Sequence, residues 1–251
     1  MDSNIMKISF IIIEYYSIDD VLNCISSIEK LDLRFDYEVI VSSNSVYASE
    51  KRMKLESRWS SFKWCFNEKN GGFAYAMNQG LKIAEGNVLV IMNPDVRIEK
   101  GIDEMVNYLL SNPAVGIIAP QVKNKKGATQ DSFREFITPF NFVTRHINRL
   151  IKCEKKIIVK SPCIVDWVIG AFMMMSRQTY ELIGGLDDNY FLYCEDMDLC
   201  KRIWLKGYSV VYYPAAIIEY EGTRSARARL KYSCIFLKSL IRYWRQFGIW
   251  N

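Results

Sequence analysis

The sequence predicts an α/β fold built on a mainly parallel central sheet, with helices on both faces of that sheet. Three observations lead to this prediction. Apolar runs alternate with helical patterns through the first half of the chain. The runs lack polar alternation, which is typical of strands buried on both faces. Several of them end in short polar turns, as ligand-binding sheets of this class do.

The first half, residues 7–120, supplies most of this evidence. Strands are expected at residues 7–13, 37–41, 62–66, 87–92 and 115–119, and helices at 18–28, 48–58, 70–84 and 102–110. Polar turns follow three strands, at Ser42–Ser45, Asn70–Gly72 and Asn93–Asp95. Because ligands bind at the carboxyl ends of parallel strands, the three turns are expected on one rim.

The second half, residues 121–220, has a different character. Residues 121–160 are basic and poorly periodic, so we interpret them as an insertion that is partly helical near 140–151. Strands are expected at 163–168, 171–176, 208–213 and 216–220, and helices at 177–183 and 195–206. An arginine-rich connector at 221–230 leads to a last helix over 231–247.

Composition limits the classes of function. The chain has 251 residues, of which 50% are hydrophobic and 24% charged, so it is an ordinary globular sequence. One histidine and seven cysteines without paired spacing argue against a Cys/His zinc site. The net charge of +5 is mild and fits an anionic ligand or an anionic lipid surface, and the sequence carries no nucleic-acid-binding motif.

Residues 187–198 combine five carboxylates with three aromatic side chains. This mixture indicates carboxylates at the lip of an apolar pocket, where burial can tune a pKa for general base chemistry. A loop that enters a helix with an acidic first turn explains the same residues through the helix dipole. The stretch alone does not decide between these two interpretations.

Three further motifs also have two interpretations each. Asn93-Pro94-Asp95 ends a strand where a carboxylate can bind a divalent ion, but Asn-Pro turns are common. The helix start at Asn70-Gly71-Gly72 can present N–H groups to a phosphate, or it is a capped core helix. Asp166-Trp167 places an indole near Gly170, either as a sugar platform or as core.

Together, the order and spacing of these motifs resemble the family 2 inverting glycosyltransferases, which have the two-part GT-A fold, and within them bacterial rhamnosyltransferases. The resemblance runs from about Lys7 to Tyr220. It is carried by Asn70-x-Gly72-Phe73-x-x-Ala76-x-Asn78-x-Gly80, Met92-Asn93-Pro94-Asp95, Asp166-Trp167-x-x-Gly170-Ala171, Gly184-Gly185-Leu186-Asp187, Phe191-Leu192-Tyr193-x-Glu195-Asp196-x-Asp198-Leu199-x-x-Arg202 and Gly207-Tyr208-x-Val210-x-Tyr212-x-Pro214.

The resemblance implies a role for each matching residue. Asp95 would hold Mg²⁺ or Mn²⁺ against the donor diphosphate, with Glu219 as a further ligand, and Asp196 would be the general base. The implied donor-binding residues are Ser43, Asn44, Asn70, Gly72, Phe73, Asn78 and Asn93. Trp167, Gly170, Ala171 and Glu195 would line the acceptor and sugar pocket, and Asp187, Asp198 and Arg202 would support the base.

The chain departs from the family pattern at three points. Glu14-Tyr15-Tyr16 stands where relatives have Thr-Tyr-Asn after the first strand. Ser43-Asn44 replaces Asp-Asn, whose Asp touches the nucleoside, so base recognition is open. Relatives often carry a metal-binding His after the last strand, and here Glu219 occupies that point and could serve as an oxygen ligand.

The expected organisation is a single GT-A domain over 1–220 and a basic amphipathic helix within 221–251. The domain comprises a Rossmann-like nucleotide-sugar half (7–120) and an acceptor half (121–220). The last helix has Phe236, Leu237, Leu240, Ile241, Trp244 and Phe247 on one side and Lys238, Arg242 and Arg245 on another. This pattern favours contact with an anionic membrane, and simple packing of the stripe on the domain is the alternative.

The resemblance thus implies a metal-dependent inverting transferase. It would move L-rhamnose from dTDP-rhamnose to a lipid-linked saccharide, for a bacterial surface polysaccharide of the O-antigen kind. The expected location is the cytoplasmic face of the cell membrane, where the protein would be peripheral. Two alternatives are another dTDP- or UDP-sugar as donor, and a non-catalytic relative that binds sugar or nucleotide.

Overall fold

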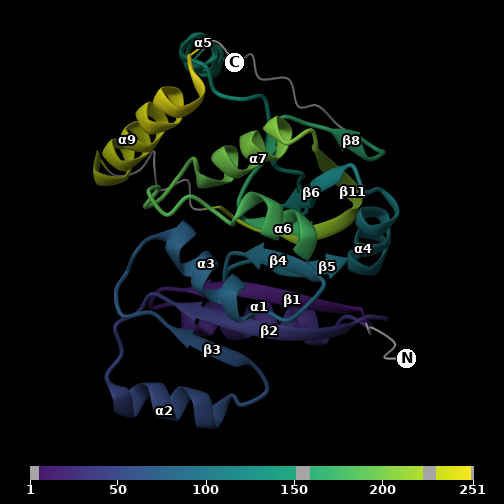
Figure 1. Ribbon diagram of the computed structural model, residues 1–251, viewed down its shortest axis with the longest axis vertical. Coiled ribbons are helices and arrows are strands. Elements are labelled where there is room, and N and C mark those ends of the chain that lie inside the picture. The colour runs from purple at the N-terminus through teal and green to yellow at the C-terminus, as the bar shows by residue number, and fades with distance from the viewer. Residues whose placement is uncertain (1–5, 151–158, 223–229, 250–251) are drawn as a thin grey trace.

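The computed structural model describes residues 6–150, 159–222 and 230–249, and only the backbone of 145–150. One sheet runs through both halves of the chain, with strand order β3-β2-β1-β4-β10-β6-β11-β5 and β8 beside β11. Figure 1 shows the N-terminal strands in the lower part of the molecule and the later elements above them. The strands are β1 (Lys7–Glu14), β2 (Asp36–Ser43), β3 (Lys63–Phe66), β4 (Val88–Met92), β5 (Arg97–Lys100), β6 (Val115–Lys123), β8 (Cys163–Ile164), β10 (Phe172–Ser176) and β11 (Ser209–Glu219).

Helices cover both faces of this sheet, as the sequence predicts. They are α1 (Ile18–Glu29), α2 (Ser49–Arg58), α3 (Phe73–Ile83), α4 (Ile102–Ser111), α5 (Pro139–Leu150), α6 (Arg177–Ile183), α7 (Glu195–Leu205) and α9 (Leu230–Phe247). Helices α1 and α4 belong to one buried apolar cluster together with Phe10 and Ile12. Helices α3, α7 and α9 belong to a second cluster together with Ile11 and Ile40, on the other face. Alternate residues of a strand point to opposite faces, so β1 contributes to both clusters.

The sheet is parallel in its first part and mixed in its second. Strands β3, β2, β1 and β4 are parallel neighbours, which confirms the strand–helix alternation. Strand β10 then runs antiparallel between β4 and β6, and β5 runs antiparallel to β11. The predicted mainly parallel sheet is therefore confirmed by the β3-β2-β1-β4 strands and by the parallel pair β6 and β11, and the antiparallel strands β10, β5 and β8 complete it.

Three details of the second half differ from the expectation. β11 is one strand of eleven residues, whereas two strands were expected, because its register with β6 shifts between Tyr213 and Ile217 without ending the pairing. The short strand β5 was not expected. The interval 163–168 forms two separate strands, β8 and β9 (Trp167–Val168), and β9 pairs with β7 (Phe133–Arg134). The arginine-rich connector falls largely outside the described residues.

Candidate active site

The parallel strands β1, β2, β3 and β4 end at one edge of the sheet, and the polar turns after β2 and β3 meet there. Asn44, after β2, donates hydrogen bonds through Nδ2 to the carbonyl of Gly72 at 2.9 Å and to Oδ1 of Asn70 at 3.2 Å. Its own Oδ1 accepts a bond from Nδ2 of Asn67 at 3.0 Å. Two of the three predicted turns thus form one hydrogen-bonded rim, and Asn44 is almost completely buried within it.

Ser43 and Glu14 face each other at this rim. The two residues are register partners at the ends of the parallel strands β2 and β1. The Ser43 hydroxyl donates to one Glu14 carboxylate oxygen, and the other oxygen accepts bonds from the Tyr47 hydroxyl at 3.0 Å and the Ser17 amide at 2.9 Å. The Glu14 carboxyl thus lies beside Ser43 at the end of the neighbouring strand, at a position that the sequence analysis treats only as a departure from the family pattern.

Gly72 brings the stretch 187–198 against the start of α3. Its φ of +94° lies in the left-handed region, and a Cβ here would come within 2.1 Å of the Phe191 carbonyl oxygen. The Phe73 amide, at the first turn of α3, donates to that same carbonyl at 3.0 Å. Only glycine allows this approach, so the acidic-aromatic stretch is anchored to the nucleotide-binding half.

Asn78 contacts the protein rather than open space. Its Nδ2 donates to the Leu186 carbonyl at 2.8 Å and to the Asp188 carboxylate, while its Oδ1 accepts the Leu186 amide at 2.9 Å. Phe73 is likewise buried in the core. Both residues therefore shape the turn before the acidic stretch and the wall beneath it, and the structure does not support direct donor contacts by their side chains.

Asp95 is a half-buried carboxylate at the end of β4. Burial raises the pKa of this carboxyl, and the Asp20 carboxylate adds to the increase, while Arg97 and Lys125 oppose it. A cation beside this carboxylate would favour its charged form and so offset the effect of burial. Among the described residues no group of three or more His, Cys, Asp or Glu side chains could hold a metal alone. Mg²⁺ commonly binds through one or two carboxylates plus phosphates and water, so Asp95 suits a phosphate-bridged ion.

Asp196 and Asn93 are tied to the same short backbone segment. Asp196 is the second residue of α7, and its Oδ2 accepts a bond from the Gly170 amide at 2.9 Å. The carbonyl of the next residue, Ala171, accepts the Asn93 amide at 3.0 Å. A Cβ on Gly170 would lie 3.3 Å from the Asp196 Cβ, so this glycine permits the close approach. The segment Gly170–Ala171 thus places the predicted base beside the turn that carries Asp95.

The environment of Asp196 suits a general base. Burial raises its pKa, while the amides of Gly170 and Met197 hold the charged form and oppose the increase. Its neighbour Glu195 is more deeply buried, with one oxygen unpartnered, and burial together with the Asp196 charge raises its pKa well above the usual range. Asp196 remains partly exposed. Of these two adjacent acids, Asp196 is the one that can be ionised and reached by a substrate.

Two other acids of the stretch, Asp198 and Asp187, pair with arginines. Asp198 is fully buried and its Oδ1 accepts Nε of Arg202 at 2.7 Å. Arg202 also donates to the carbonyls of Ile183 and Gly185, which ties α7 to the end of α6. Asp187 accepts a bond from Arg242 of α9 at 2.8 Å. These contacts hold α7 in place, and the supporting role expected for Asp187, Asp198 and Arg202 stays a prediction.

Trp167 lies in the core rather than in the pocket expected for it. It is 5% exposed and its indole N–H donates to the Glu135 carbonyl at 2.9 Å. Glu219 is the last residue of β11 and its role as a metal ligand stays a prediction. Tyr220 follows the strand, and its hydroxyl accepts a bond from Asn93 Nδ2 at 3.0 Å, so Tyr220 contacts the Asn93–Asp95 turn.

Helix α9 packs on the acidic-aromatic stretch. The Ser239 hydroxyl donates to the Leu192 carbonyl at 2.9 Å, and the Phe236 and Tyr193 rings meet at 5.9 Å. Leu240 and Tyr243 are buried. The apolar stripe of this helix thus covers the domain, which was the alternative interpretation, while Leu237 and Ile241 remain 49% and 40% exposed.

Comparison with known proteins agrees with this arrangement. The model of the family described as "Glycosyl transferase family 2" matches residues 9–183, well over half of the chain. The chain belongs to glycosyl transferase family 2. A second model, described as "N-terminal domain of galactosyltransferase", matches residues 162–225.

Relatives of this transferase include two named rhamnosyltransferases. "Rhamnosyltransferase WbbL" of Escherichia coli is 26% identical over 155 residues, which cover 60% of this chain and 58% of that protein. "N-acetylglucosaminyl-diphospho-decaprenol L-rhamnosyltransferase" of Mycobacterium tuberculosis is 26% identical, covering 55% of this chain and 48% of that protein. "Low-salt glycan biosynthesis hexosyltransferase Agl10" of Haloferax volcanii is 27% identical, covering 78% and 61%. The chain therefore matches only about half to three-fifths of each relative's length.

Solved structures establish the fold of the transferase as GT-A. A crystal structure of GalNAc-T7 with UDP, GalNAc and Mn²⁺ superposes with a TM-score of 0.66 at 16% identity, covering 87% of this chain and 44% of that one. The mannosyltransferase PcManGT from Pyrobaculum calidifontis, in complex with GDP-Man and Mn²⁺, gives a TM-score of 0.57 at 17% identity, covering 85% and 56%. These likenesses confirm the predicted fold class.

Proposed function

We propose that this family 2 glycosyltransferase is an inverting, metal-dependent rhamnosyltransferase that transfers L-rhamnose from dTDP-rhamnose to a lipid-linked saccharide. The observation that carries the proposal is the Gly170–Ala171 segment, which bonds both to the Asp196 carboxylate and to Asn93, two residues before Asp95. Displacement at a sugar–diphosphate bond requires a base for the acceptor hydroxyl and a cation beside the diphosphate. The proposed base and the proposed cation-binding carboxylate lie on either side of this segment. The names of two relatives favour rhamnose.

In this proposal Asp196 takes the proton from an acceptor hydroxyl. The hydroxyl oxygen forms a bond to the anomeric carbon as the bond from that carbon to the diphosphate oxygen breaks, with inversion. Mg²⁺ or Mn²⁺ held by Asp95 would supply charge neutralisation for the departing diphosphate. Gly170 keeps the base in place through its amide, and Glu195 lies beside it at the acceptor side.

The nucleoside end of the donor is assigned to the rim at Glu14, Ser43 and Asn44. A buried carboxylate bonded to hydroxyl groups can accept an N–H from a pyrimidine base after a small rearrangement of those hydroxyls. Glu14 thereby takes over the charge that relatives have at the Ser43 position. This supports retained donor recognition and weighs against the non-catalytic alternative.

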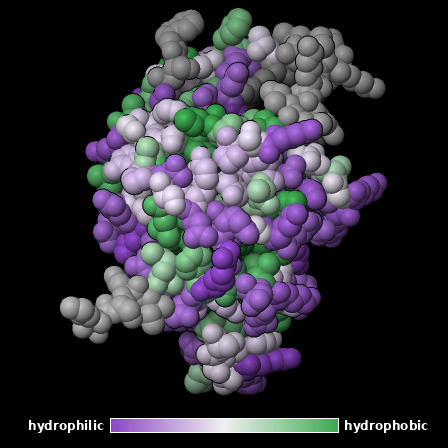
Figure 2. All heavy atoms as spheres, turned by 90° about the vertical axis from the view of Figure 1, so that its right-hand side faces the viewer, coloured by the Kyte–Doolittle hydropathy of each residue, from purple (hydrophilic) through white to green (hydrophobic). Residues whose placement is uncertain are grey.

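The surface of α9 supports a peripheral place at an anionic membrane. The helix carries no acidic residue, and its exposed side combines Leu237 and Ile241 with Lys238 and Arg245. Figure 1 places α9 on one flank of the molecule, and Figure 2 shows the opposite flank as mainly hydrophilic, with hydrophobic residues in small groups. In the described part of the chain no helix is both long enough and apolar enough to cross a bilayer. In this proposal the exposed side of α9 contacts the membrane that carries the lipid-linked acceptor, where the protein acts in the synthesis of a bacterial surface polysaccharide.

A panel of donors tests the proposal. The protein is incubated with dTDP-rhamnose, other dTDP-sugars, UDP-sugars and GDP-mannose, with and without Mg²⁺ or Mn²⁺, and with a bacterial membrane extract as acceptor. Release of nucleoside diphosphate from dTDP-rhamnose that depends on both metal and extract is the expected result. Turnover of UDP-sugars alone would contradict dTDP-rhamnose as the donor. If no donor is turned over, the proposal that the protein is an enzyme is wrong.

A further inference from the structure

Tyr220 occupies a place at the site that the roles above leave unexplained. Its backbone is held from both sides, because its amide donates to the Lys123 carbonyl at 2.9 Å and its carbonyl accepts the Gln130 side-chain amide. The direction of the ring is therefore set by β6 and by the segment after it. The hydroxyl at the end of this ring reaches Asn93 Nδ2 at 3.0 Å.

The surroundings of the Tyr220 hydroxyl are acidic. Burial, together with the nearby Asp95 and Asp196 carboxylates, raises the pKa of Tyr220 to about 12. The phenol is thus protonated at neutral pH. Because Asn93 donates to the phenolic oxygen, the phenol keeps its own O–H as a donor.

The backbone of the turn after β4 is held by several hydrogen bonds. The Asn93 amide donates to the Ala171 carbonyl at 3.0 Å, and the Asn93 carbonyl accepts the Val96 amide at 3.4 Å. Arg97 Nη1 donates to the Pro94 carbonyl at 3.1 Å. These bonds hold the main chain, whereas the bond to the Tyr220 phenol holds the Asn93 side chain.

We propose that Tyr220 is a positioning residue of the donor-diphosphate subsite. It fixes the Asn93 side chain, and through it the Asn93–Asp95 turn, in the orientation that receives a divalent cation and the diphosphate. The inference rests on the proposed function, which places these groups at Asp95. It gives Tyr220, the residue after Glu219, a place beside the Asn93–Asp95 turn that would hold the metal.

The test combines Tyr220→Phe, Asn93→Ala and the double variant in a double-mutant cycle. Binding of Mn²⁺ with dTDP, and separately with UDP, is measured by titration calorimetry, and KM and kcat are measured with the donor that turns over. Tyr220→Phe is expected to weaken Mn²⁺–dTDP binding and to raise KM by about 10-fold, with kcat changed less and the melting temperature unchanged. Since Tyr220 acts through Asn93, the double variant should bind no more weakly than Asn93→Ala alone.

Tyr213→Phe is the matched control. Tyr213 is a partly buried tyrosine of β11, the strand that precedes Tyr220, and its ring contacts Tyr108 at 5.2 Å, so its variant should bind as the wild type does. Unchanged Mn²⁺–dTDP binding in Tyr220→Phe, or effects of the two single variants that simply add, would overturn the inference while leaving the proposed function intact. A wild-type protein that binds neither Mn²⁺–dTDP nor Mn²⁺–UDP would overturn both.

Discussion

Asp196 and Glu195 are adjacent acids, yet their surroundings give them different chemistry. Two amide N–H groups, from Gly170 and Met197, hold the Asp196 carboxylate at 2.9 and 2.8 Å. One oxygen of Glu195 is buried without a partner. Burial disfavours a charge, and hydrogen bonds to the charged form favour it, so ionisation falls to Asp196. Its catalytic role remains a prediction that rests on this difference.

The environment of Asp196 predicts how the rate depends on pH. The base must be deprotonated, and burial raises its pKa above that of an exposed aspartate, about 3.9. The turnover rate at saturating donor and metal should therefore fall with decreasing pH, and the midpoint of this fall should lie above the pKa of an exposed aspartate. Binding of the nucleoside diphosphate, followed over the same pH interval, separates this effect from titration of Asp95. A rate that keeps its plateau down to about pH 4 while the protein stays folded would contradict the assignment.

Several residues of the site could be predicted from sequence because their type and spacing carry the information. Asn93, Asp95, Gly170 and Asp196 are of this kind. The place of Glu14 could not be predicted in the same way, since it depends on the register of β1 with β2. Tyr220 was missed because its contact with Asn93 joins residues 127 positions apart and depends on where the chain leaves β11. The sequence did contain one indication that Glu14 belongs to the site, because a charged residue follows directly on a buried apolar strand there.

At the level of elements, the stretch 187–198 acts as a bridge between the two halves. Its Phe191 carbonyl meets Gly72 and the first turn of α3, its far end begins α7, and α9 covers it. The sequence indicated a pocket here, and it could not show these contacts because they join segments that are far apart along the chain, 47 residues in the case of Ser239 and Leu192. The antiparallel direction of β10 escaped prediction for another reason: an apolar run does not reveal its direction.

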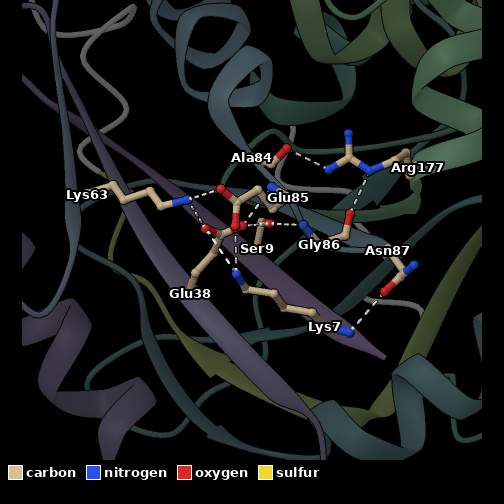
Figure 3. Close-up of polar contacts among 9 residues, drawn as sticks. All are labelled: Lys7, Ser9, Glu38, Lys63, Ala84, Glu85, Gly86, Asn87 and Arg177. Carbon is tan, nitrogen blue, oxygen red and sulfur yellow. Dashed lines mark hydrogen bonds and ion pairs between the residues drawn. The ribbon is translucent and has the colours of Figure 1, made fainter. Parts of the chain in front are cut away.

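The opposite end of the sheet is held by an ion-pair network. Glu38 on β2 is 9% exposed and its carboxylate lies 2.8 Å from Lys63 Nζ and 3.5 Å from Lys7 Nζ. It also accepts bonds from the Ser9 hydroxyl at 2.6 Å and the Glu85 amide at 2.7 Å. Figure 3 shows these side chains converging from three strands and from the segment that follows α3. The network fixes β1, β2 and β3 at the rim away from the site.

This network predicts a loss of stability in acid. Burial opposes ionisation of Glu38, but the bonds from Lys63, Ser9 and Glu85 outweigh it and lower the pKa to about 2. A lowered folded-state pKa means that the stabilisation is complete above the unfolded value, about 4.5, and is lost as the pH falls towards 2. After allowance for solvent screening at the exposed lysines, the contribution is about 1–2 kcal/mol.

Glu38→Gln should therefore lower the free energy of unfolding by about 1–2 kcal/mol at pH 7, with a smaller difference from the wild type at pH 3. Urea denaturation at both pH values measures the effect. The control is Glu50→Gln, which breaks the exposed Glu50–Lys54 pair on α2 and should cost less than about 0.5 kcal/mol. Equal losses in the two variants, or a Glu38→Gln difference that does not shrink in acid, would contradict the account.

At the scale of the whole molecule, α9 has two sides with different surroundings. One side packs on the acidic-aromatic stretch through Phe236, Ser239 and Tyr243. The other exposes aliphatic and basic side chains. The sequence predicts an amphipathic helix with one apolar stripe, and the structure divides that stripe: Leu240 and Trp244 pack on the protein, whereas Leu237 and Ile241 are exposed. Arg242 is paired with Asp187, so Lys238 and Arg245 are the basic residues considered on the exposed side.

Charge reversal on this exposed side should weaken binding to anionic membranes. Each basic residue near an anionic surface contributes about 1 kcal/mol, so Lys238→Glu with Arg245→Glu should reduce binding to phosphatidylglycerol vesicles by at least about 30-fold. The matched control reverses Lys51 and Arg58 on α2, at the other end of the molecule in Figure 1. Sedimentation with vesicles measures both. Equal loss in the two double variants would show that net charge, rather than this face, determines binding.

The base assignment is the central claim, and the measurement that tests it most directly compares Asp196→Asn with Glu195→Gln. The two variants make the same chemical change at adjacent positions. Transfer of sugar from the donor and affinity for the nucleoside diphosphate are measured for each. The account predicts that Asp196→Asn lowers the transfer rate by about 10²–10⁴-fold while diphosphate affinity is retained, and that Glu195→Gln lowers it far less. An Asp196→Asn protein that transfers sugar at the wild-type rate would contradict the account.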